Sequence, residues 1–360
     1  MRIAVVGGGI NGVMSAWALR RRGQEVELFE RGVLMGATSS ASTKLLHGGL
    51  RYLEQGDVRL VREGLHERAW WMKQAPRLTR RVELFLPVYD GAPRGRFTLS
   101  VGLTLYDWLS GRATLGAHRW WSARTLPTCV SGLKTTGLRG AFSYFDAQMD
   151  DAALGRWAAD RARDDGVVIH EHAEVTHVAP DGELRTTRDV RRFDAIANVA
   201  GPWARALLDA SGVPSSTTLD LVRGSHLVVN RRIEAGFALN LPSDGRLVFA
   251  LPYHDRTLVG TTEVRQTLDD AIECSAAERA YLIDAYNTFF TTPIRDADVE
   301  TTFAGLRPLV DAGRSAHAQR RGERIETKGR IVSVFGGKWT TSRVLGEHVA
   351  VRVSALAPAS

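Results

Sequence analysis

Two short apolar runs lie within the first thirty positions of the chain, with a helical pattern between them. The first run spans Arg2 to Val6 and is rich in β-branched residues, and the second spans Glu25 to Glu30. A continuous apolar run of this length is typical of a strand buried on both faces of a parallel sheet. The residues in between, as far as Arg22, favour a helix. The chain is therefore predicted to begin with a strand–helix–strand unit.

Further along the chain, the pattern predicts a mixture of helices and strands. Apolar spacing predicts helices over 57–72, 96–112, 150–164 and 276–290, and strands over 167–169, 174–178, 194–200, 225–229, 246–251 and 257–262. The residues 252–256 suit a hairpin turn, 324–335 a second hairpin, and a glycine pair at 336–337 precedes a last helix. For 96–112, which is apolar with basic ends, two interpretations remain open: a core helix of a second domain, or an interfacial helix lying on lipid.

This order of elements predicts an α/β protein with two domains woven from alternating stretches of chain. The strands near both ends suit a doubly wound sheet, and those between 221 and 262 suit an antiparallel sheet. We assign 1–86, 140–205 and 300–360 to the first domain, and 87–139 and 206–299 to the second. A ligand cleft is expected between the two.

Glycines follow the first strand at the positions that a dinucleotide-binding turn requires. Gly7 permits the tight turn, Gly9 lets the backbone approach a pyrophosphate, and Gly12 lets the helix pack against the strand. The helix N-terminus then presents its amides to the phosphates. Glu30 ends the second strand, where its carboxylate can accept hydrogen bonds from a ribose. A glycine turn without a ligand is the alternative, but strand, glycines, helix, strand and acid occur here in the expected order.

Composition narrows the range of partners. The 360 residues carry a formal net charge of +7, and 44% of them are hydrophobic, as in an ordinary globular protein. Arginine is spread along the chain without a basic block, so nucleic acid is not expected, whereas an anionic substrate or membrane surface is. The two cysteines, Cys129 and Cys274, lack metal-ligand spacing, so we expect neither a metal site nor a structural disulfide. The first strand begins at Arg2 and no run suits a membrane helix, which predicts a cytoplasmic protein.

The segment that follows the first strand–helix–strand unit concentrates chemically active side chains. Residues 36–54 begin with small hydroxyl residues and continue through glycines, so the backbone can lie close to a ligand. The segment also holds Lys44, His47, Arg51 and Tyr52. A solvated loop is the alternative, but four such side chains close together favour a binding segment.

Five further motifs, together with the glycine turn, resemble the FAD-dependent glycerol-3-phosphate dehydrogenases. The resemblance extends from Arg2 to about His348. It implies a Rossmann-like FAD domain of the glutathione-reductase type, a mixed antiparallel-sheet substrate cap domain like that of the amino-acid oxidases, and oxidation of sn-glycerol 3-phosphate to dihydroxyacetone phosphate. The motifs are His47-Gly-Gly-Leu-Arg-Tyr-Leu-Glu54, Gly224-Ser-His226, Gly260-Thr-Thr262, Gly305-Leu-Arg-Pro308 and Phe335-Gly-Gly-Lys-Trp-Thr-Thr341.

The resemblance also implies roles for individual residues. The substrate site would use Arg51, Tyr52, Arg307, Arg321 and Lys338, with Thr341 nearby, and Arg320 is an alternative to Arg321. The FAD would lie against Thr38, Ser39, Gly201, Gly337, Lys338 and Thr340, in addition to Gly7, Gly9, Gly12 and Glu30. The sequence departs from the family at Trp339 and Ser342, where a smaller apolar residue and a tyrosine are more usual, and it stops at Ser360, whereas members typically continue as a helical C-terminal domain.

The chemistry of alcohol oxidation restricts the catalytic candidates. A flavin accepts a hydride from an alcohol carbon only if a base removes the hydroxyl proton and the carbon is held over flavin N5. The cations Arg307, Arg321 and Lys338 suit a phosphate dianion, although any one of them could instead form an ordinary salt bridge. His226 and His47 are the candidate bases because unperturbed histidine titrates near neutral pH. His226 is preferred, since it starts a strand in the cap sheet and shares a face with Val228, and a structural histidine is the alternative. His47 adjoins two glycines in a loop expected to pass the flavin, so backbone positioning by a hydrogen bond is its expected role.

Two other classes of function remain open on this sequence. One is an amine or amino-acid oxidase on the same scaffold, and the other is a non-catalytic flavoprotein or redox sensor. Quinone or oxygen is the expected electron acceptor, and the inner face of the cell membrane is a possible peripheral contact. Turnover of carboxylated or amino substrates in place of phosphorylated alcohols would distinguish the first alternative.

Overall fold

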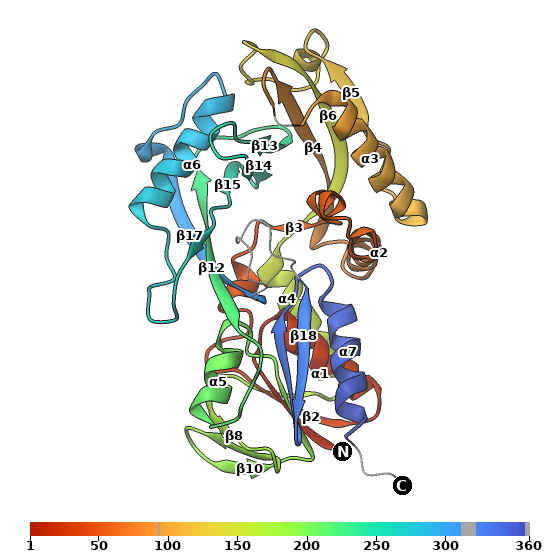
Figure 1. Cartoon of the computed structure of the whole chain (residues 1–360), viewed down its shortest axis with the longest axis vertical. Coiled ribbons are helices and arrows are strands. Elements are labelled where there is room, and N and C mark those ends of the chain that lie inside the picture. The colour runs from red at the N-terminus through yellow and green to blue at the C-terminus, as the bar shows by residue number, and fades with distance from the viewer. Residues whose placement is uncertain (93, 311–321, 357–360) are drawn as a thin grey trace.

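The computed structural model describes residues 1–92, 94–310 and 322–356 of the chain. Two sheets dominate these residues, and Figure 1 shows them one above the other along the longest axis. The lower sheet has six strands, and the upper sheet has ten, of which eight follow one path and two pair beside it. No described helix combines the length and the apolar character needed to cross a membrane.

The six-stranded sheet is the predicted doubly wound one, in the order β18-β19-β11-β1-β2-β7. Its strands are parallel except β18, which forms a hairpin with β19. Their bounds are β1 (Arg2–Val6), β2 (Glu25–Phe29), β7 (Val168–His170), β11 (Ala195–Asn198), β18 (Glu323–Lys328) and β19 (Ile331–Gly336).

Both faces of this sheet are covered, which explains the unbroken apolar run at its centre. In β1, Ile3 and Val5 pack in a hydrophobic core on one face of the sheet, whereas Ala4 and Val6 pack in a second core on the other face. The helices on the first face are α1 (Ile10–Arg21), α4 (Asp151–Asp164) and α7 (Ser342–Ser354). On the second face lie α5 (Ala204–Ala210) and a small sheet of β8 (Val175–Val178), β9 (Glu183–Thr186) and β10 (Val190–Arg192).

The ten-stranded sheet is mostly antiparallel, and only β13 and β4 pair in parallel. Its main path runs β16-β12-β15-β14-β13-β4-β6-β3, with β17 beside β12 and β5 beside β6. The bounds are β3 (Leu45–Leu46), β4 (Thr79–Tyr89), β5 (Arg119–Ser122), β6 (Leu138–Met149), β12 (Leu219–Val229), β13 (Gly236–Asn240), β14 (Leu247–Tyr253), β15 (Arg256–Gly260), β16 (Val264–Arg265) and β17 (Val299–Val310). The predicted turn between β14 and β15 is confirmed.

Helices pack on both faces of the ten-stranded sheet. The helix α6 (Ala276–Phe289) packs on the face to which Leu227 and Val229 point, and α2 (Val58–Gln74) and α3 (Arg96–Ser110) pack on the face of Val228. Short 3-10 segments complete the fold: η1 (Thr38–Ser40), η2 (Leu50–Gln55), η3 (Gly111–Ala113), η4 (Leu126–Thr128), η5 (Gly201–Trp203) and η6 (Asp296–Asp298).

The sheets divide the chain differently from the predicted boundaries. Boundaries at 86/87, 139/140 and 299/300 cut through or detach β4, β6 and β17, each of which lies wholly in the ten-stranded sheet. Most of each of these long strands falls within a stretch assigned to the first domain, because a strand's own pattern does not reveal which sheet it joins. We propose a division that follows sheet membership.

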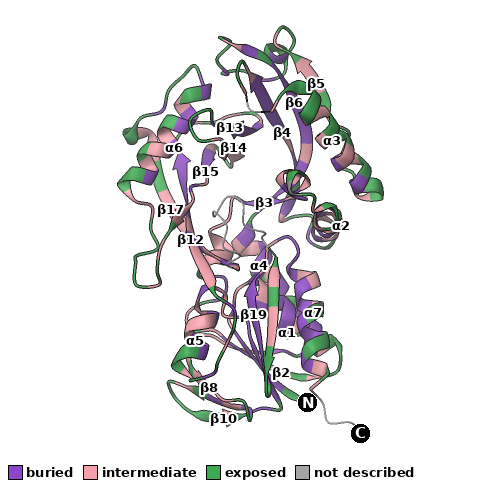
Figure 2. Ribbon diagram, in the orientation of Figure 1, coloured by how far each residue is buried: buried purple, intermediate pink, exposed green. Residues whose placement is uncertain are grey.

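The helix α3 has one buried side and one exposed side. Leu103, Tyr106 and Leu109 are buried in the core with α2, as a cap-domain helix requires. The opposite side is open, with Phe97 81% exposed and Trp108 74% exposed. Figure 2 shows this change from buried to exposed across the helix.

Candidate active site

The glycine turn has the close contacts that its sequence predicts. A Cβ on Gly12 would lie 1.9 Å from the carbonyl oxygen of Gly7, and a Cβ on Gly7 would lie 2.5 Å from that of Val199. Gly7 also has a φ of +111°, which L-residues rarely adopt. At Gly9 a Cβ would approach the Ser39 hydroxyl, which accepts a hydrogen bond from the Ile10 amide at 2.9 Å. The glycine turn therefore exposes backbone groups, and no glycine side chain, to the space beside the start of α1.

The carboxylate of Glu30 is held at the end of β2 by backbone amides. Its Oε2 accepts from the Gly8 amide at 2.7 Å and its Oε1 from the Gly32 amide at 2.8 Å. Each carboxylate oxygen can accept a further hydrogen bond. Glu30 lines the same cavity as Gly7 and Gly9, so the geometry agrees with the predicted ribose contact.

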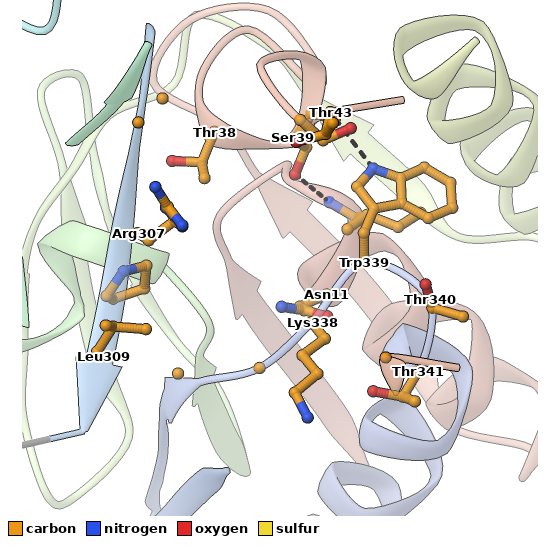
Figure 3. A pocket seen from close by; sticks show the side chains of 18 of the residues that line it. Asn11, Thr38, Ser39, Thr43, Arg307, Leu309, Lys338, Trp339, Thr340 and Thr341 are labelled. Atoms are coloured by element: carbon orange, nitrogen blue, oxygen red, sulfur yellow. Dashed lines mark hydrogen bonds between the residues drawn. The ribbon is translucent and has the colours of Figure 1, made fainter. Parts of the chain in front are cut away.

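One cavity of about 950 Å³ connects the glycine turn with the ten-stranded sheet. It runs from β1 and η5 past η1 and the segment after β19 to β12 and β17 (Figure 3). Among the predicted site residues, those lining it are Gly7, Gly9, Glu30, Thr38, Ser39, His47, Arg51, Tyr52, Gly201, His226, Arg307, Gly337, Lys338, Thr340 and Thr341. Gly12 lies behind it against Gly7, and Arg321, with its alternative Arg320, falls outside the described residues.

Hydrogen bonds join the η1 loop to both sheets. The Thr38 hydroxyl donates to the Leu306 carbonyl of β17 at 2.7 Å, and the Trp339 indole donates to the Ser39 carbonyl at 2.9 Å. Trp339 in turn packs on Trp71, with ring centroids 5.1 Å apart, and the Trp71 indole donates to the Thr340 carbonyl. Trp339 thus supports the cavity wall.

Alternate residues of β12 and β17 present one face to the cavity. His226 lies opposite Phe303, Gly224 opposite Gly305, and Val222 opposite Arg307. A Cβ on Gly224 would lie 2.3 Å from Nη2 of Arg307, so the glycine makes room for the guanidinium. Arg307 points from β17 toward the open middle of the cavity in Figure 3.

Arg307 is held by neighbouring backbone and charge. Its Nη2 donates to the Thr262 carbonyl at 2.6 Å, and its Nη1 lies 3.8 Å from a carboxylate oxygen of Glu263. A guanidinium has five N–H groups, so it can bind an anion while keeping the contact to Thr262. Lys338 lies over the Tyr52 ring, with Nζ 4.1 Å from the centroid. The described part of the predicted cation set therefore lines one cavity.

The expectation that His226 titrates near neutral pH is wrong. The side chain is only 2% exposed, its Nε2 lies 3.0 Å from the Thr43 hydroxyl, and its ring stacks on Phe303. Burial, together with the positive charges of Arg307 and Lys44, lowers the pKa of His226 to about 3. The imidazole is neutral at physiological pH but is a weak base, because its conjugate acid is strongly disfavoured.

His47 lies on the cavity wall at the end of β3. Its backbone amide donates to the Thr340 hydroxyl at 3.3 Å, which joins this loop to the segment before α7. The side chain is partly exposed and the residue lines the cavity. The structure therefore favours His47 over His226 as a group that could exchange a proton with a ligand.

Several residues beside the site escaped the sequence prediction. Thr43 contacts His226, and Glu278 on α6 accepts hydrogen bonds from Thr262 at 2.6 Å and Ser225 at 2.8 Å. Burial works against the charge of Glu278, but these bonds and Arg223 lower its pKa to about 2. A Ser275–Glu278 capping box marks the start of α6, and this pattern is a sequence signal that could have drawn attention to Glu278.

The family model for FAD dependent oxidoreductases matches residues 2–352. The chain belongs to the FAD-dependent oxidoreductase family. A glycerol-3-phosphate dehydrogenase from Pseudomonas aeruginosa is 37% identical over an alignment covering 96% of this chain and 70% of the relative. An aerobic glycerol-3-phosphate dehydrogenase from Staphylococcus haemolyticus is 31% identical, with 98% of this chain and 66% of the relative covered. This chain thus spans about two thirds of the length of these relatives, and the predicted family resemblance is confirmed.

Solved structures confirm the predicted fold class. The glycerol-3-phosphate dehydrogenase from Bacillus halodurans, complexed with FAD, superposes with a TM-score of 0.79 at 24% identity, covering 99% of this chain and 64% of that one. Glycine oxidase from Geobacillus kaustophilus gives a TM-score of 0.75 at 22% identity, covering 98% and 95%. At these identities the likeness shows the fold alone.

The cofactor of this family is FAD, and the residues present fit it. The side-chain-free turn at Gly7 and Gly9 and the oriented carboxylate of Glu30 suit a pyrophosphate and a ribose. In addition, the buried Oδ1 of Asn11, which lines the cavity, has no hydrogen-bond partner among the described residues. Among the described residues, no group of three or more histidine, cysteine, aspartate or glutamate side chains could hold a metal ion.

Proposed function

We propose that the protein oxidises sn-glycerol 3-phosphate, or a closely related phosphorylated secondary alcohol, to the ketone, dihydroxyacetone phosphate. The observation that carries this proposal is the meeting of Arg51, Arg307 and Lys338 with the dinucleotide turn in one cavity. Bound FAD would supply the hydride acceptor at N5. An unphosphorylated alcohol would offer these cations no phosphate to bind.

The cofactor contacts follow from the cavity lining. Glu30 would bind the adenosine ribose, and the backbone at Gly7 and Gly9, backed by Gly12, would face the pyrophosphate. Thr38, Ser39, Gly201, Gly337 and Thr340 would lie along the flavin. The Ser39 and Thr38 hydrogen bonds described above support this arrangement, because they keep the η1 loop close to β17 and α1.

The substrate contacts place charge at the phosphate and a base at the reacting hydroxyl. Arg307, with Arg51, Lys338 and the predicted Arg321, would bind the phosphate, and Tyr52 and Thr341 would complete the pocket. The hydroxyl proton would pass to a base as the carbon-bound hydrogen leaves as hydride, which gives the ketone. We assign the base to His47 because His226 is buried, contacts Thr43 and has a pKa of about 3.

Anaerobic mixing of the purified protein with a panel of substrates tests this function. Phosphorylated secondary alcohols should bleach the flavin absorbance, whereas glycerol, glycine and proline should not. Bleaching by an amino acid and not by a phosphorylated alcohol would establish the amino-acid oxidase alternative. A His47→Asn variant should reduce flavin roughly 10²–10⁴-fold more slowly than wild type. A wild-type rate in His47→Asn and a slow rate in His226→Asn would return the role of base to His226.

For the electron acceptor we propose a quinone rather than oxygen. The lining of the same cavity includes a cluster of leucines from η2, α2, β4 and α3, which we call the apolar arm: Leu50, Leu53, Leu60, Leu86, Leu99 and Leu105. This arm lies beside the exposed Phe97, Val101 and Trp108 of α3, which would contact a membrane that holds the quinone. Val101 lines the cavity and is 54% exposed, so a Val101→Glu variant places a negative charge beside the apolar arm. This variant should be reoxidised more slowly by a short-chain quinone and at the wild-type rate by oxygen. Equal loss with both acceptors would refute this route.

Membrane contact can be tested separately. Vesicles containing anionic lipid should carry the wild-type protein in a flotation gradient, and a Phe97→Glu, Trp108→Glu double variant should remain at the bottom. Val190→Glu on β10 is the matched control, because Val190 is 61% exposed and β10 lies at the other end of the molecule in Figure 1. Equal flotation of all three proteins would rule out α3 as the contact.

A further inference from the structure

A buried chain of hydrogen bonds ends at the peptide that follows His47. The Gly48 amide donates to the Tyr106 hydroxyl at 2.9 Å, and that hydroxyl donates to Oδ1 of Asp146 at 2.8 Å. Arg68 donates to the same oxygen at 2.8 Å. Tyr106 and Asp146 are each 2% exposed, and Arg68 is 1% exposed. Groups this deeply buried depend on one another for their polar contacts.

The direction of these bonds is fixed by the environment. Burial, and the nearby charge of Asp146, raise the pKa of Tyr106 well above its ordinary value, so the phenol stays protonated. Burial also raises the pKa of Asp146, while Arg68 opposes that change. The Tyr106 hydroxyl therefore donates its proton in the hydrogen bond to Asp146, and its oxygen accepts the hydrogen bond from the Gly48 amide.

The hydrogen bond between Gly48 and Tyr106 holds the backbone next to His47, which lines the cavity. The amide of His47 donates to Thr340 and the next amide donates to Tyr106, so the peptides on both sides of the His47 Cα are held. Gly48 has no room for a side chain, because a Cβ would lie 2.6 Å from Leu65 and 2.9 Å from the Tyr106 oxygen. The helical turn η2, with Arg51 and Tyr52, begins two residues further on.

We propose that Tyr106 is a positioning residue for the reaction: supported by Asp146 and Arg68, it fixes the His47–Gly48 peptide and so aims the His47 side chain into the cavity. This inference rests on the proposed function for its kinetic consequence, but the contact itself is independent of the substrate. Tyr106 acts through His47 and does not line the cavity, whereas Asp146 does. Removing only the hydroxyl should therefore leave FAD bound and disturb proton removal.

The test compares Tyr106→Phe with Tyr286→Phe in the FAD-loaded protein. Tyr286 is also 2% exposed, lies on α6 away from the cavity, and serves as the control for loss of a buried hydroxyl. In Tyr106→Phe, the Gly48 amide should exchange with solvent deuterium at least tenfold faster, and flavin reduction at saturating sn-glycerol 3-phosphate should slow roughly 10- to 100-fold. Substrate affinity and FAD content should change little, and Tyr286→Phe should match wild type in every readout.

Three results would overturn the inference: unchanged exchange at Gly48, faster exchange without slower flavin reduction, or equal losses in both variants, which would indicate general loosening of the core. Failure of the proposed function gives a different result. In that case the wild-type flavin would not be reduced by sn-glycerol 3-phosphate at all, while Gly48 exchange would still rise in Tyr106→Phe. The kinetic arm would then be repeated with whichever compound of the substrate panel bleaches the flavin.

Discussion

Replacing Arg307 by alanine is the perturbation that isolates phosphate recognition. The substitution removes a cation that faces the cavity, with a side chain 22% exposed, and leaves Glu263 and the Thr262 carbonyl without this guanidinium. Truncating one member of a buried charge pair costs about 2–5 kcal/mol, and partial exposure to solvent moves the expectation to the lower part of that range. We expect kcat/KM for sn-glycerol 3-phosphate to fall roughly 30- to 1,000-fold, which corresponds to a loss of about 2–4 kcal/mol of transition-state stabilisation.

Steady-state kinetics with two substrates and a control variant make this prediction specific. Arg307→Ala should retain its FAD and its low activity on glycerol, whereas Arg307→Lys should recover part of the loss because it restores the charge without the bidentate geometry. Arg256→Ala removes an arginine of the same sheet that pairs with Glu300 outside the cavity, and it should behave as wild type. Equal losses on the phosphorylated and unphosphorylated substrates would show that Arg307 maintains the fold or the flavin position.

Three further predictions follow from the structure. Gly12→Ala should abolish FAD binding, measured by flavin absorbance after gel filtration, because the new Cβ would lie 1.9 Å from the Gly7 oxygen; a yellow variant would contradict the close packing of this turn. Glu278→Ala should destabilise the protein by about 3–5 kcal/mol in denaturant unfolding, since it leaves Arg223 buried without its carboxylate, and a loss under 1 kcal/mol would refute that role. The pKa of His226 is lowered to about 3, so between about pH 3 and 6.5 the unfolded chain binds a proton at this histidine that the folded protein does not bind. The free energy of unfolding should therefore fall by roughly 1 kcal/mol per pH unit as the pH decreases through that window. His226→Asn should show a shallower decrease between pH 6.5 and 5, and identical slopes in the two proteins would contradict the shift.

The nucleotide turn could be predicted because its determinants are local. Gly7, Gly9, Gly12 and Glu30 lie within one strand–helix–strand unit, and each contact follows from its place in that unit. The pattern also identified the helices α2, α3, α4 and α6. It could not assign strands to sheets, because β4 pairs with β6 and β13, which are distant in the sequence.

The chemical state of the site could not be predicted for the same reason. The low pKa of His226 depends on burial and on Arg307 and Lys44, which come from other parts of the chain. Tyr106 appears in the sequence as one aromatic residue on an apolar helix face, and only the fold brings its hydroxyl to Gly48 and Asp146. Residue types at motif positions thus indicated where the cavity would lie, whereas the ionisation states and supporting contacts required the tertiary structure.

We propose that the cavity binds FAD and that the protein oxidises a phosphorylated secondary alcohol there. Anaerobic rapid mixing of the yellow protein with sn-glycerol 3-phosphate, followed by flavin absorbance and assay of dihydroxyacetone phosphate, tests it most directly. We predict saturable bleaching with one ketone formed per flavin reduced, and no bleaching by glycerol at the same concentration. A flavin that remains oxidised with every phosphorylated alcohol of the panel, or that bleaches equally with glycerol, would contradict the claim.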